Sequence, residues 1–212
     1  PFCCRYDKID VMNLPPCFLE LSALYEAHGY SLFLIGGTSR DLLLGLSPLD
    51  LDFVTDAPAE ASLSFLDKAD GTFARYGSIK VHHGEQTIDI TTLREEGDYR
   101  DSRHPGYLRF IQDKEKDSQR RDFTVNALYI DKDGTIYDYH RGLEDLEKKV
   151  LRFIGDPQKR IEEDPLRIIR AERFAKRLGF VFEEKTKKAI EENRHLLAKL
   201  NPDKIAMELK KE

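Results

Sequence analysis

The sequence predicts an α+β fold, with a mixed head of strands and helices followed by a helical region. Short apolar or alternating runs punctuated by glycines fill the first two thirds of the 212-residue chain. From about residue 157 onward the patterns are helical only. Strands and helices that are segregated in this way favour a mixed sheet with flanking helices and a helical extension.

The head begins with patterns that can be assigned one by one. Ser39 suits a helix start and Gly45 a helix end, while the run LDLDFVT alternates apolar and acidic residues like a strand with one polar face. Gly77 and Gly84 punctuate the strand-like runs that follow. We therefore expect helices at 18–28, 39–45 and 58–69, and strands at 31–35, 49–55, 72–82 and 86–93.

The second half of the chain is less regular at first. Residues 95–119 are charged with little apolar periodicity, which predicts a long loop, and such loops are usually functional. Residues 121–130 suit a helix or a mixed segment, and 135–139 one arm of a hairpin. Helices are expected at 157–178, 183–198 and 202–211, so we place a head at 1–150 and a helical neck at 151–212.

Composition narrows the class of protein. The net charge of −5 excludes a uniformly basic nucleic-acid binder, and no apolar run approaches the roughly 20 residues of a membrane span. The charge is uneven, however, with a net −9 over 1–140 and +4 over 141–212. The acidic part could carry metal-binding carboxylates and the basic part could bind phosphates, or the surface charge could simply be uneven. Cys3, Cys4 and Cys17 are too few and too poorly spaced for a disulfide framework or zinc site, and no signal peptide is visible. We expect a reducing, cytoplasmic compartment.

The first candidate site joins a glycine pair to two carboxylates. Gly36 and Gly37 precede Arg40 at the start of an expected helix, where backbone N–H groups can approach a phosphate. Asp50 and Asp52 are two apart on an expected strand and would share a face, where a cation such as Mg²⁺ relieves their repulsion. Each feature alone equally suits a tight turn or a solvated strand face, and only their joint occurrence points to a nucleoside triphosphate and metal.

Two further signals are weaker. Asp89 lies between isoleucines and can either join the aspartates as a third carboxylate or face solvent. Arg120 and Arg121 can hold phosphate or ribose oxygens in a bidentate manner, although surface arginine pairs are common.

The last candidate site lies in the expected helix 157–178. Asp164 and Arg167 are three apart and place an acceptor next to a donor, and Arg170 and Arg173 continue the same broad face. An equally good account makes Asp164 a helix cap before Pro165 and pairs the arginines with Glu163 and Glu172.

Taken together, these stretches resemble the class II tRNA nucleotidyltransferases, the CCA-adding family within the polymerase-β-like superfamily. The matching motifs are long, ordered and spread over most of the chain, although Thr38-Ser39 departs from the small residue and Val that the family more often has. The motifs are GGTSRDLLLG (36–45), DLDFVTDA (50–57), DITTLR (89–94), YRDSRHPGYLRF (99–110), RRDFTVNALYID (120–131), DYHRGLEDL (138–146) and EEDPLRIIRAERFAKRLGF (162–180).

The resemblance implies a polymerase-β-like nucleotidyltransferase head, a helical neck and a role for each motif. Asp50 and Asp52 would bind catalytic Mg²⁺. Gly36, Gly37, Arg40 and Arg121 would bind the nucleotide, Asp164 and Arg167 would read its base as a protein template, and Arg170 and Arg173 would support them. It also implies that the chain ends before the body and tail that grip tRNA.

The implied reaction is template-independent addition of CMP and AMP, from CTP and ATP, to the tRNA 3′ end. The segment 95–119, with Arg100, Asp101 and Arg103, looks full length for the loop that the family associates with adding the terminal A. An A-adding enzyme or a bacterial poly(A) polymerase is the alternative, although 71–83 lacks the basic signature of the latter. A non-catalytic RNA-binding module ranks last, because it has no use for paired carboxylates.

Overall fold

A computed structural model describes the head and neck of the chain. It covers residues 8–48, 50–97 and 107–210. Several residues singled out in the sequence lie outside the described residues: Cys3, Cys4, Leu49, Arg100, Asp101 and Arg103.

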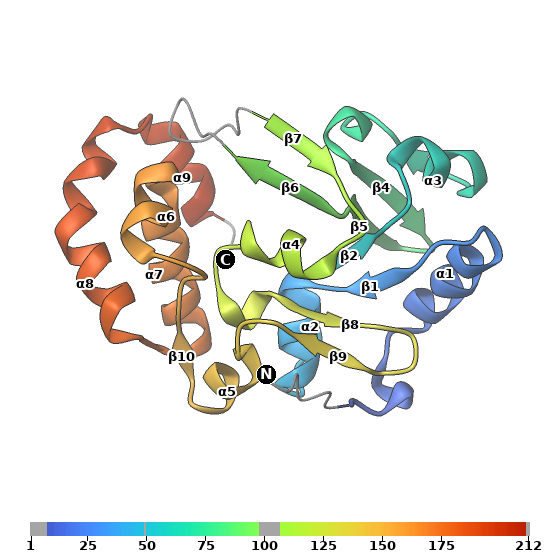
Figure 1. Cartoon of the computed structure of the whole chain (residues 1–212), viewed down its shortest axis with the longest axis horizontal. Coiled ribbons are helices and arrows are strands. Elements are labelled where there is room, and N and C mark those ends of the chain that lie inside the picture. Colours follow the sequence, from blue (N-terminus) through green and yellow to red (C-terminus); the bar gives the residue numbers. More distant parts are fainter. Residues whose placement is uncertain (1–7, 49, 98–106, 211–212) are drawn as a thin grey trace.

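A seven-stranded mixed sheet forms the head (Figure 1). Its strand order is β3-β4-β5-β2-β1-β8-β9, with β2 and β5 parallel and the other neighbours antiparallel. This confirms the predicted α+β class. The strands are β1 (Leu32–Leu34), β2 (Leu51–Thr55), β3 (Ala69–Asp70), β4 (Ser78–His83), β5 (Gln86–Thr92), β8 (Leu128–Ile130) and β9 (Ile136–Asp138).

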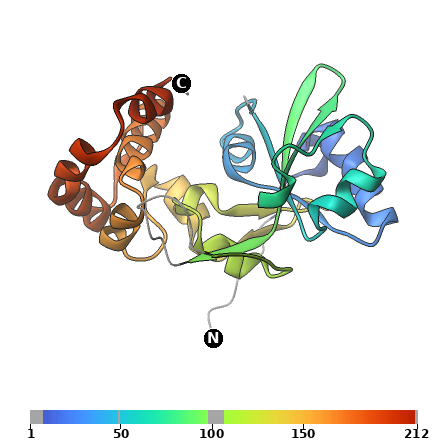
Figure 2. The ribbon, with the colours of Figure 1, turned by 90° about the horizontal axis from the view of Figure 1, so that it is seen from above.

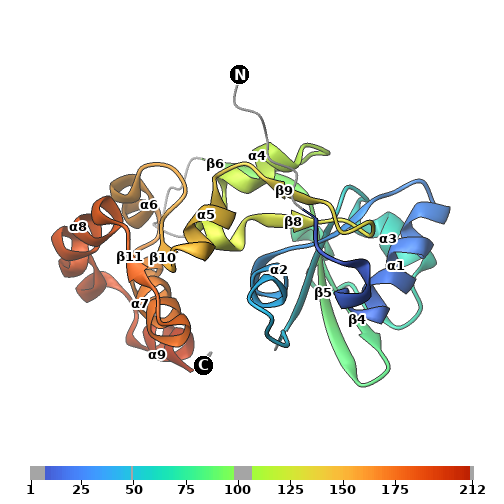
Figure 3. The ribbon, with the colours of Figure 1, turned by 90° about the horizontal axis from the view of Figure 1, so that it is seen from below.

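Alternation along β1 gives the sheet two apolar faces. Leu32 and Leu34 belong to the main core, whereas Phe33 and Ile35 pack into a smaller cluster on the other face. Figure 3 shows α1 and α2 on one side of the sheet and α4 on the other, where Lys114 of α4 lies 4.5 Å from the ring centre of Phe33. The head helices are η1 (Val11–Asn13), α1 (Pro16–Ala27), α2 (Gly36–Leu43), α3 (Ala59–Phe65), η2 (Ala74–Tyr76), α4 (Lys114–Gln119), η3 (Thr124–Asn126) and α5 (Gly142–Glu147).

The predicted loop at 95–119 is wrong over most of its described length. β6 (Arg94–Gly97) and β7 (Tyr107–Phe110) form an antiparallel hairpin, and α4 follows with Asp113 as its side-chain cap. The strands carry charged residues on both faces, so they lack the apolar alternation that identifies a half-buried strand from sequence.

Three predicted head elements differ from the structure. The helix expected at 39–45 is α2, which begins at Gly36, so Ser39 is buried inside the helix and does not cap it. The strand expected at 72–82 is preceded by η2 and begins at Ser78. The helix expected at 58–69 ends at Phe65, and residues 69–70 form β3. The segment 121–130, expected to be a helix or a mixed segment, is mixed, with the 3-10 turn η3 leading into β8.

The neck contains four α-helices within the described residues, gathered at one end of the molecule (Figure 1). Asp164, with φ −150°, interrupts the single helix expected at 157–178, because Pro165 disfavours helical backbone in the residue before it. A two-stranded parallel pair, β10 with β11, was not predicted. The elements are β10 (Val150–Leu151), α6 (Pro157–Glu163), α7 (Leu166–Leu178), β11 (Val181–Phe182), α8 (Glu184–Asn193), η4 (Arg194–Lys199) and α9 (Pro202–Leu209).

Figure 2 shows the neck helices at one end of the molecule and most of the head at the other. Head and neck are joined by aromatic packing. Phe123 of the head stacks on Phe153 with ring centres 4.9 Å apart, and it meets Phe174 of α7 edge-on at 5.7 Å. Phe123 and Phe153 are buried, and one continuous core contains residues of both regions. The boundary that we expected near residue 150 therefore falls beside this shared packing.

Candidate active site

A cleft of about 380 Å³ lies between the head and the neck. The head supplies one wall, and Asp164 and helix α7 supply the other. Eight residues singled out from the sequence line it: Gly36, Gly37, Asp52, Arg120, Arg121, Asp164, Arg167 and Arg170. Five more residues complete the lining: Arg94, Glu96, Asp122, Asn126 and Phe174. The predicted residues Asp50, Arg40 and Arg173 are not part of this lining.

The head wall is built by a close approach of α2 to β2. Gly36 has φ +67°, and a Cβ there would lie 3.2 Å from Oδ2 of Asp52, so glycine suits both the backbone and the space. Thr38 fixes the approach, because its hydroxyl accepts from the N–H of Asp52 at 2.8 Å and donates to the carbonyl of Asp50 at 3.0 Å. The residue that departs from the family pattern thus holds the two aspartates in place.

On the head wall, the surroundings of Asp52 destabilise the ionised form of its carboxylate. Burial, followed by the nearby charge of Asp89, raises the pKa of Asp52 to about 6. Asp89 is its register partner on β5 and binds Lys80 at 2.7 Å, so Asp89 stands beside Asp52 while its side chain is 41% exposed, and its part as a third carboxylate stays a prediction. Asp50 is exposed, lies in a bend directly before β2 and does not line the cleft, so only Asp52 of the expected pair stands on the strand itself.

These residues suit a divalent cation that is also held by a ligand. Within the described residues, no three acidic, His or Cys side chains gather closely enough to form a metal site by themselves. Mg²⁺, however, commonly takes one or two carboxylates and completes its shell with water and phosphate oxygens. A cation near Asp52 would relieve the electrostatic cost that raises its pKa.

Arg40 is buried at 1% exposure and holds α2 to its surroundings. Its guanidinium donates to Oδ1 of Asp41 at 2.8 and 2.6 Å and to Oδ1 of Asn126 at 2.8 Å. It also lies 5.2 Å from the ring centre of Phe174 on α7. The structure therefore gives Arg40 contacts that support both walls, and its predicted contact with a triphosphate remains a prediction.

Arg121 is held at the cleft by a buried carboxylate. Asp117 of α4 accepts from Arg121 at 3.0 Å, from Arg120 at 2.9 Å and from the hydroxyl of Tyr129 at 2.6 Å. Burial acts to raise the pKa of Asp117, but Arg121 and Arg120 outweigh it and hold that pKa well below its ordinary value. A permanently ionised Asp117 thus presents two arginines to the cleft.

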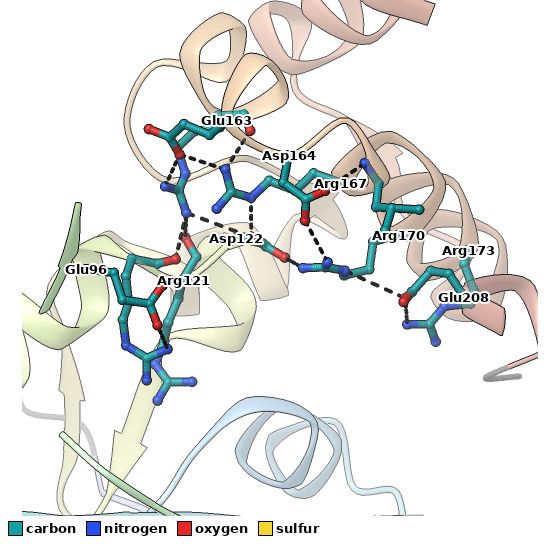
Figure 4. Close-up of polar contacts among 12 residues, drawn as sticks. Glu96, Arg121, Asp122, Glu163, Asp164, Arg167, Arg170, Arg173 and Glu208 are labelled. Atoms are coloured by element: carbon teal, nitrogen blue, oxygen red, sulfur yellow. Dashed lines mark hydrogen bonds and ion pairs between the residues drawn. The ribbon is translucent and has the colours of Figure 1, made fainter. Parts of the chain in front are cut away.

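The neck wall is organised around Asp122 (Figure 4). Its Oδ1 accepts from Nε of Arg167 at 2.7 Å and its Oδ2 accepts from Arg170. Burial acts to raise the pKa of Asp122, but Arg170 and Arg167 together lower it below the ordinary value. One head carboxylate therefore fixes two neck arginines across the cleft.

Arg167 has further anchors on its own side. Glu163 accepts from Nη1 of Arg167 at 2.7 Å and from Arg160 at 2.6 Å, and the carbonyl of Arg160 also accepts from Arg167 at 2.5 Å (Figure 4). A planar guanidinium held on several sides has a fixed direction.

The structure confirms the account in which Asp164 caps a helix, whereas its role in reading a base stays a prediction. Its Oδ1 accepts from the N–H of Leu166 at 3.1 Å, which caps the start of α7, and its Oδ2 accepts from Arg170 at 3.2 Å. Asp164 and Arg167 line the same cleft, but each is oriented by other partners.

Arg173 lies beyond the cleft at the end of this network. Oε1 of Glu208 on α9 accepts from Arg173 at 3.1 Å and lies 3.6 Å from Nε of Arg170 (Figure 4). Arg173 is thus connected to Arg170 through Glu208, and its supporting role at the nucleotide stays a prediction.

No role was expected for Asp117, Asp122 or Glu208, whereas Glu163 was expected as a partner of the arginines and does pair with Arg167 at 2.7 Å. Asp122 directly follows the arginine pair, so adjacency to a candidate motif was the available signal. Asp117 and Glu208 stand in ordinary charged runs, and nothing local marks them.

Comparison with known families decides the relationship. Residues 32–152, more than half of the chain, match the family model described as the poly A polymerase head domain. The chain belongs to this family. The match begins at β1 and ends just after β10, so it covers the head wall of the cleft.

The relatives in sequence are CCA-adding enzymes. The chain is 41% identical over 207 residues to the CCA-adding enzyme of Lactobacillus helveticus (strain DPC 4571), which covers 96% of this chain and 52% of that protein. It is 38% identical over 201 residues to the CCA-adding enzyme of Geobacillus stearothermophilus, covering 93% of this chain and 50% of that protein. The chain spans about half the length of the relatives that it matches.

Solved structures agree in fold. The Bacillus stearothermophilus CCA-adding enzyme in complex with CTP superposes with a TM-score of 0.83 at 34% identity, over 92% of this chain and 48% of that one. A CCA-adding enzyme in complex with ATP gives a TM-score of 0.77 at 28% identity, over 97% and 50% of the two chains. Both matches extend through the neck. Among the described residues, no helix has the length and apolar character needed to cross a membrane.

Proposed function

We propose that this chain is the nucleotide-transferring part of a CCA-adding enzyme, which adds CMP and AMP to the 3′ end of tRNA without a nucleic-acid template. The supporting observation is the cleft, which brings Gly36, Gly37 and Asp52 of the head opposite Asp164 and Arg167 of the neck. The similarity to complete CCA-adding enzymes supports the same reaction and the same partners, CTP, ATP and tRNA.

In this proposal the neck wall selects the base. Cytosine and adenine each present an exocyclic amine donor beside a ring-nitrogen acceptor, so Asp164 accepts from the amine and Arg167 donates to the ring nitrogen. Uracil and guanine present the reverse order, which leaves buried polar groups unpaired and rejects them strongly. Asp122 and Glu163 support this role, because they fix the direction of Arg167 before any nucleotide binds.

The head wall positions the reacting groups. Asp50 and Asp52 would hold Mg²⁺, which when bound neutralises the phosphates and activates the RNA 3′-hydroxyl. Gly36 and Gly37 leave room for phosphate oxygens beside the start of α2, and Arg121 faces the same cleft. Arg40, through Asp41 and Asn126, keeps α2 in register with the rest of the wall.

We also propose that the catalytic head spans 1–150 and the neck 151–212. The end of the family match at residue 152 supports this division.

Incorporation of each labelled NTP onto tRNA ending in -N, -NC and -NCC tests the proposal. We expect CMP on the first two and AMP on the third, with UTP and GTP rejected. An A-adding enzyme or a poly(A) polymerase, the latter favoured only by the name of the matched family, would ignore CTP. Absence of metal-dependent incorporation from any NTP would contradict both.

A further inference from the structure

An exposed group of aromatic side chains lies on the head outside the cleft. Phe73, Tyr76 and Phe110 are 55%, 46% and 41% exposed, and Arg75 is exposed beside them. We call these four residues the aromatic patch. Single exposed apolar residues are common on proteins, but several large rings at one place mark an interaction site.

Gly77 allows the ring of Phe110 to pack against the turn that carries the other residues of the aromatic patch. This glycine has φ +77°, and a Cβ built on it would lie 2.4 Å from the ring of Phe110, so the ring rests directly on the backbone that follows Tyr76. The 3-10 turn η2 is closed by the carbonyl of Phe73, which accepts from the N–H of Tyr76 at 2.9 Å. Figure 1 shows β7 beside the segment that leads into β4, in agreement with this contact. The ring of Phe110 therefore lies against the turn that carries Phe73 and Tyr76.

The aromatic patch continues the head wall of the cleft. Arg94, which lines the cleft, donates from Nη1 to the carbonyl of Tyr76 at 2.7 Å. Phe110 is the register partner of Arg94 in the β6–β7 hairpin, and directly opposed side chains of an antiparallel pair share a face. Phe110 thus lies on the hairpin face that carries the cleft residues Arg94 and Glu96.

The chemistry of the aromatic patch suits unpaired nucleotides. The guanidinium of Arg75 lies 4.5 Å from the ring centre of Tyr76, and among the described residues it makes no ion pair with an acidic side chain. An available cation beside exposed ring faces matches a chain of phosphates and stacking bases. The base of the incoming nucleotide has its proposed partners, Asp164 and Arg167, on the opposite wall.

We propose that the aromatic patch stacks unpaired bases at the 3′ end of an RNA as that end enters the cleft. Phe110 and Tyr76 supply ring faces, and Arg75 contacts a phosphate. The inference rests on the proposed function for the identity of the RNA as a tRNA acceptor end. It predicts that the chain binds an RNA with an unpaired 3′ end more tightly than an RNA with a blunt end.

The test is RNA binding by fluorescence anisotropy with the whole chain and no nucleotide. The probes are one labelled RNA hairpin with an unpaired 3′ -NCC end and the same hairpin with a blunt end. We expect Phe110→Leu and Tyr76→Leu each to raise the Kd of the first probe about tenfold, the change expected for one lost stacking contact. The blunt probe should be unaffected, and Tyr76→Phe should keep wild-type binding because it keeps the ring.

Tyr107→Leu is the matched control. Tyr107 is 47% exposed on the same hairpin, but it is paired with Gly97 and so lies on the other face. Unchanged binding in Phe110→Leu, or an equal loss with both probes, overturns the proposal. A changed association state with unchanged RNA binding also overturns it, because the aromatic patch would then be a protein contact.

Because binding is measured without catalysis, this outcome is independent of nucleotide transfer. A chain that binds the unpaired end through the aromatic patch but incorporates no NTP would contradict the proposed function alone.

Discussion

The two walls of the cleft carry charge in opposite ways. On the head wall the buried carboxylate of Asp52 faces the like charge of Asp89, and its pKa is raised to about 6. On the neck wall the carboxylate of Asp122 lies between Arg167 and Arg170, and its pKa is lowered. On the head wall the ionised carboxylate of Asp52 is therefore destabilised, and a bound cation would relieve this. On the neck wall the negative charge of Asp122 is balanced by two arginines, which keeps these side chains in place. Substitutions at the two walls should therefore have opposite effects on stability.

Asp52→Asn should give the largest effect. We expect NTP incorporation to fall by roughly a thousandfold or more, because a carboxylate that holds catalytic charge is removed. The same change should raise the free energy of unfolding in metal-free buffer at neutral pH, by on the order of 2 kcal/mol, because a destabilising charge disappears. Urea unfolding in EDTA measures the second effect. A less stable variant would contradict the description of the head wall.

Addition of Mg²⁺ provides the control for this first prediction. Mg²⁺ should raise the unfolding midpoint of the wild type and leave that of Asp52→Asn nearly unchanged, because a ligand stabilises only the state that binds it. If Mg²⁺ stabilised the wild type and Asp52→Asn equally, the cation would bind at a site that does not include Asp52.

Asp122→Asn should destabilise the protein by about 3 kcal/mol, because it leaves Arg167 and Arg170 without their shared anionic partner. The pKa of Asp122 is depressed in the fold, so its contribution is present above its ordinary pKa and is lost as pH falls through the folded pKa. Thermal unfolding from pH 7 down to acid should show a flatter acid limb in the variant. An unchanged midpoint at pH 7 would show that the neck wall does not depend on this carboxylate.

Asp164→Asn should change selectivity more than stability. The amide keeps an oxygen that can cap Leu166, so unfolding should be nearly unchanged, whereas Asp164→Ala should lose about 1 kcal/mol. Because the amide side chain can donate as well as accept, discrimination of the Asp164→Asn variant against UTP and GTP should fall by about a hundredfold while metal-dependent transfer persists.

Competition assays with paired labelled NTPs measure this change. If Asp164→Asn and Asp164→Ala both selected among NTPs as the wild type does, Asp164 would have no role in base recognition.

Thr38→Val should give the smallest effect, because it removes only the hydrogen bonds that join α2 to the backbone of Asp50 and Asp52. The isosteric valine removes the acceptor for the N–H of Asp52, at a cost of about 1–2 kcal/mol, and should weaken the response to Mg²⁺. Ser39→Ala is the matched control, since the buried hydroxyl of Ser39 has no hydrogen-bond partner among the described residues. Equal unfolding midpoints for the two variants would show that the hydroxyl of Thr38 does not position Asp52.

The sequence predicted the elements whose patterns are local. The alternation in β2 and the glycines around α2 identified the head wall, because a strand with one polar face and a helix boundary each leave a short-range signature. The break at Asp164 was expected only as the alternative to one helix at 157–178, because Asp164-Pro165 indicates a helix start while the apolar period continues on both sides. The β6–β7 hairpin was missed because its residues are charged on both faces.

The compensation in the neck wall could not be predicted from sequence. Asp122 meets Arg167 and Arg170 across separations of 45 and 48 residues, and only the packing of α7 against the head decides which arginine faces it. The same holds for Glu208, which approaches Arg173 from a different helix. Residue types were therefore predictable at the cleft, whereas their partners depended on tertiary structure.

The stacking of Phe123 on Phe153 and its edge-on contact with Phe174 have a consequence for how this chain unfolds. Neither side of the cleft can lose its structure without exposing rings on which the other side depends. Denaturation should thus be a single cooperative transition, and residues 1–150 expressed alone should be an unstable fragment that exposes an unmatched aromatic surface. Fusions and truncations of this protein are best designed around that cluster and not around the composition boundary.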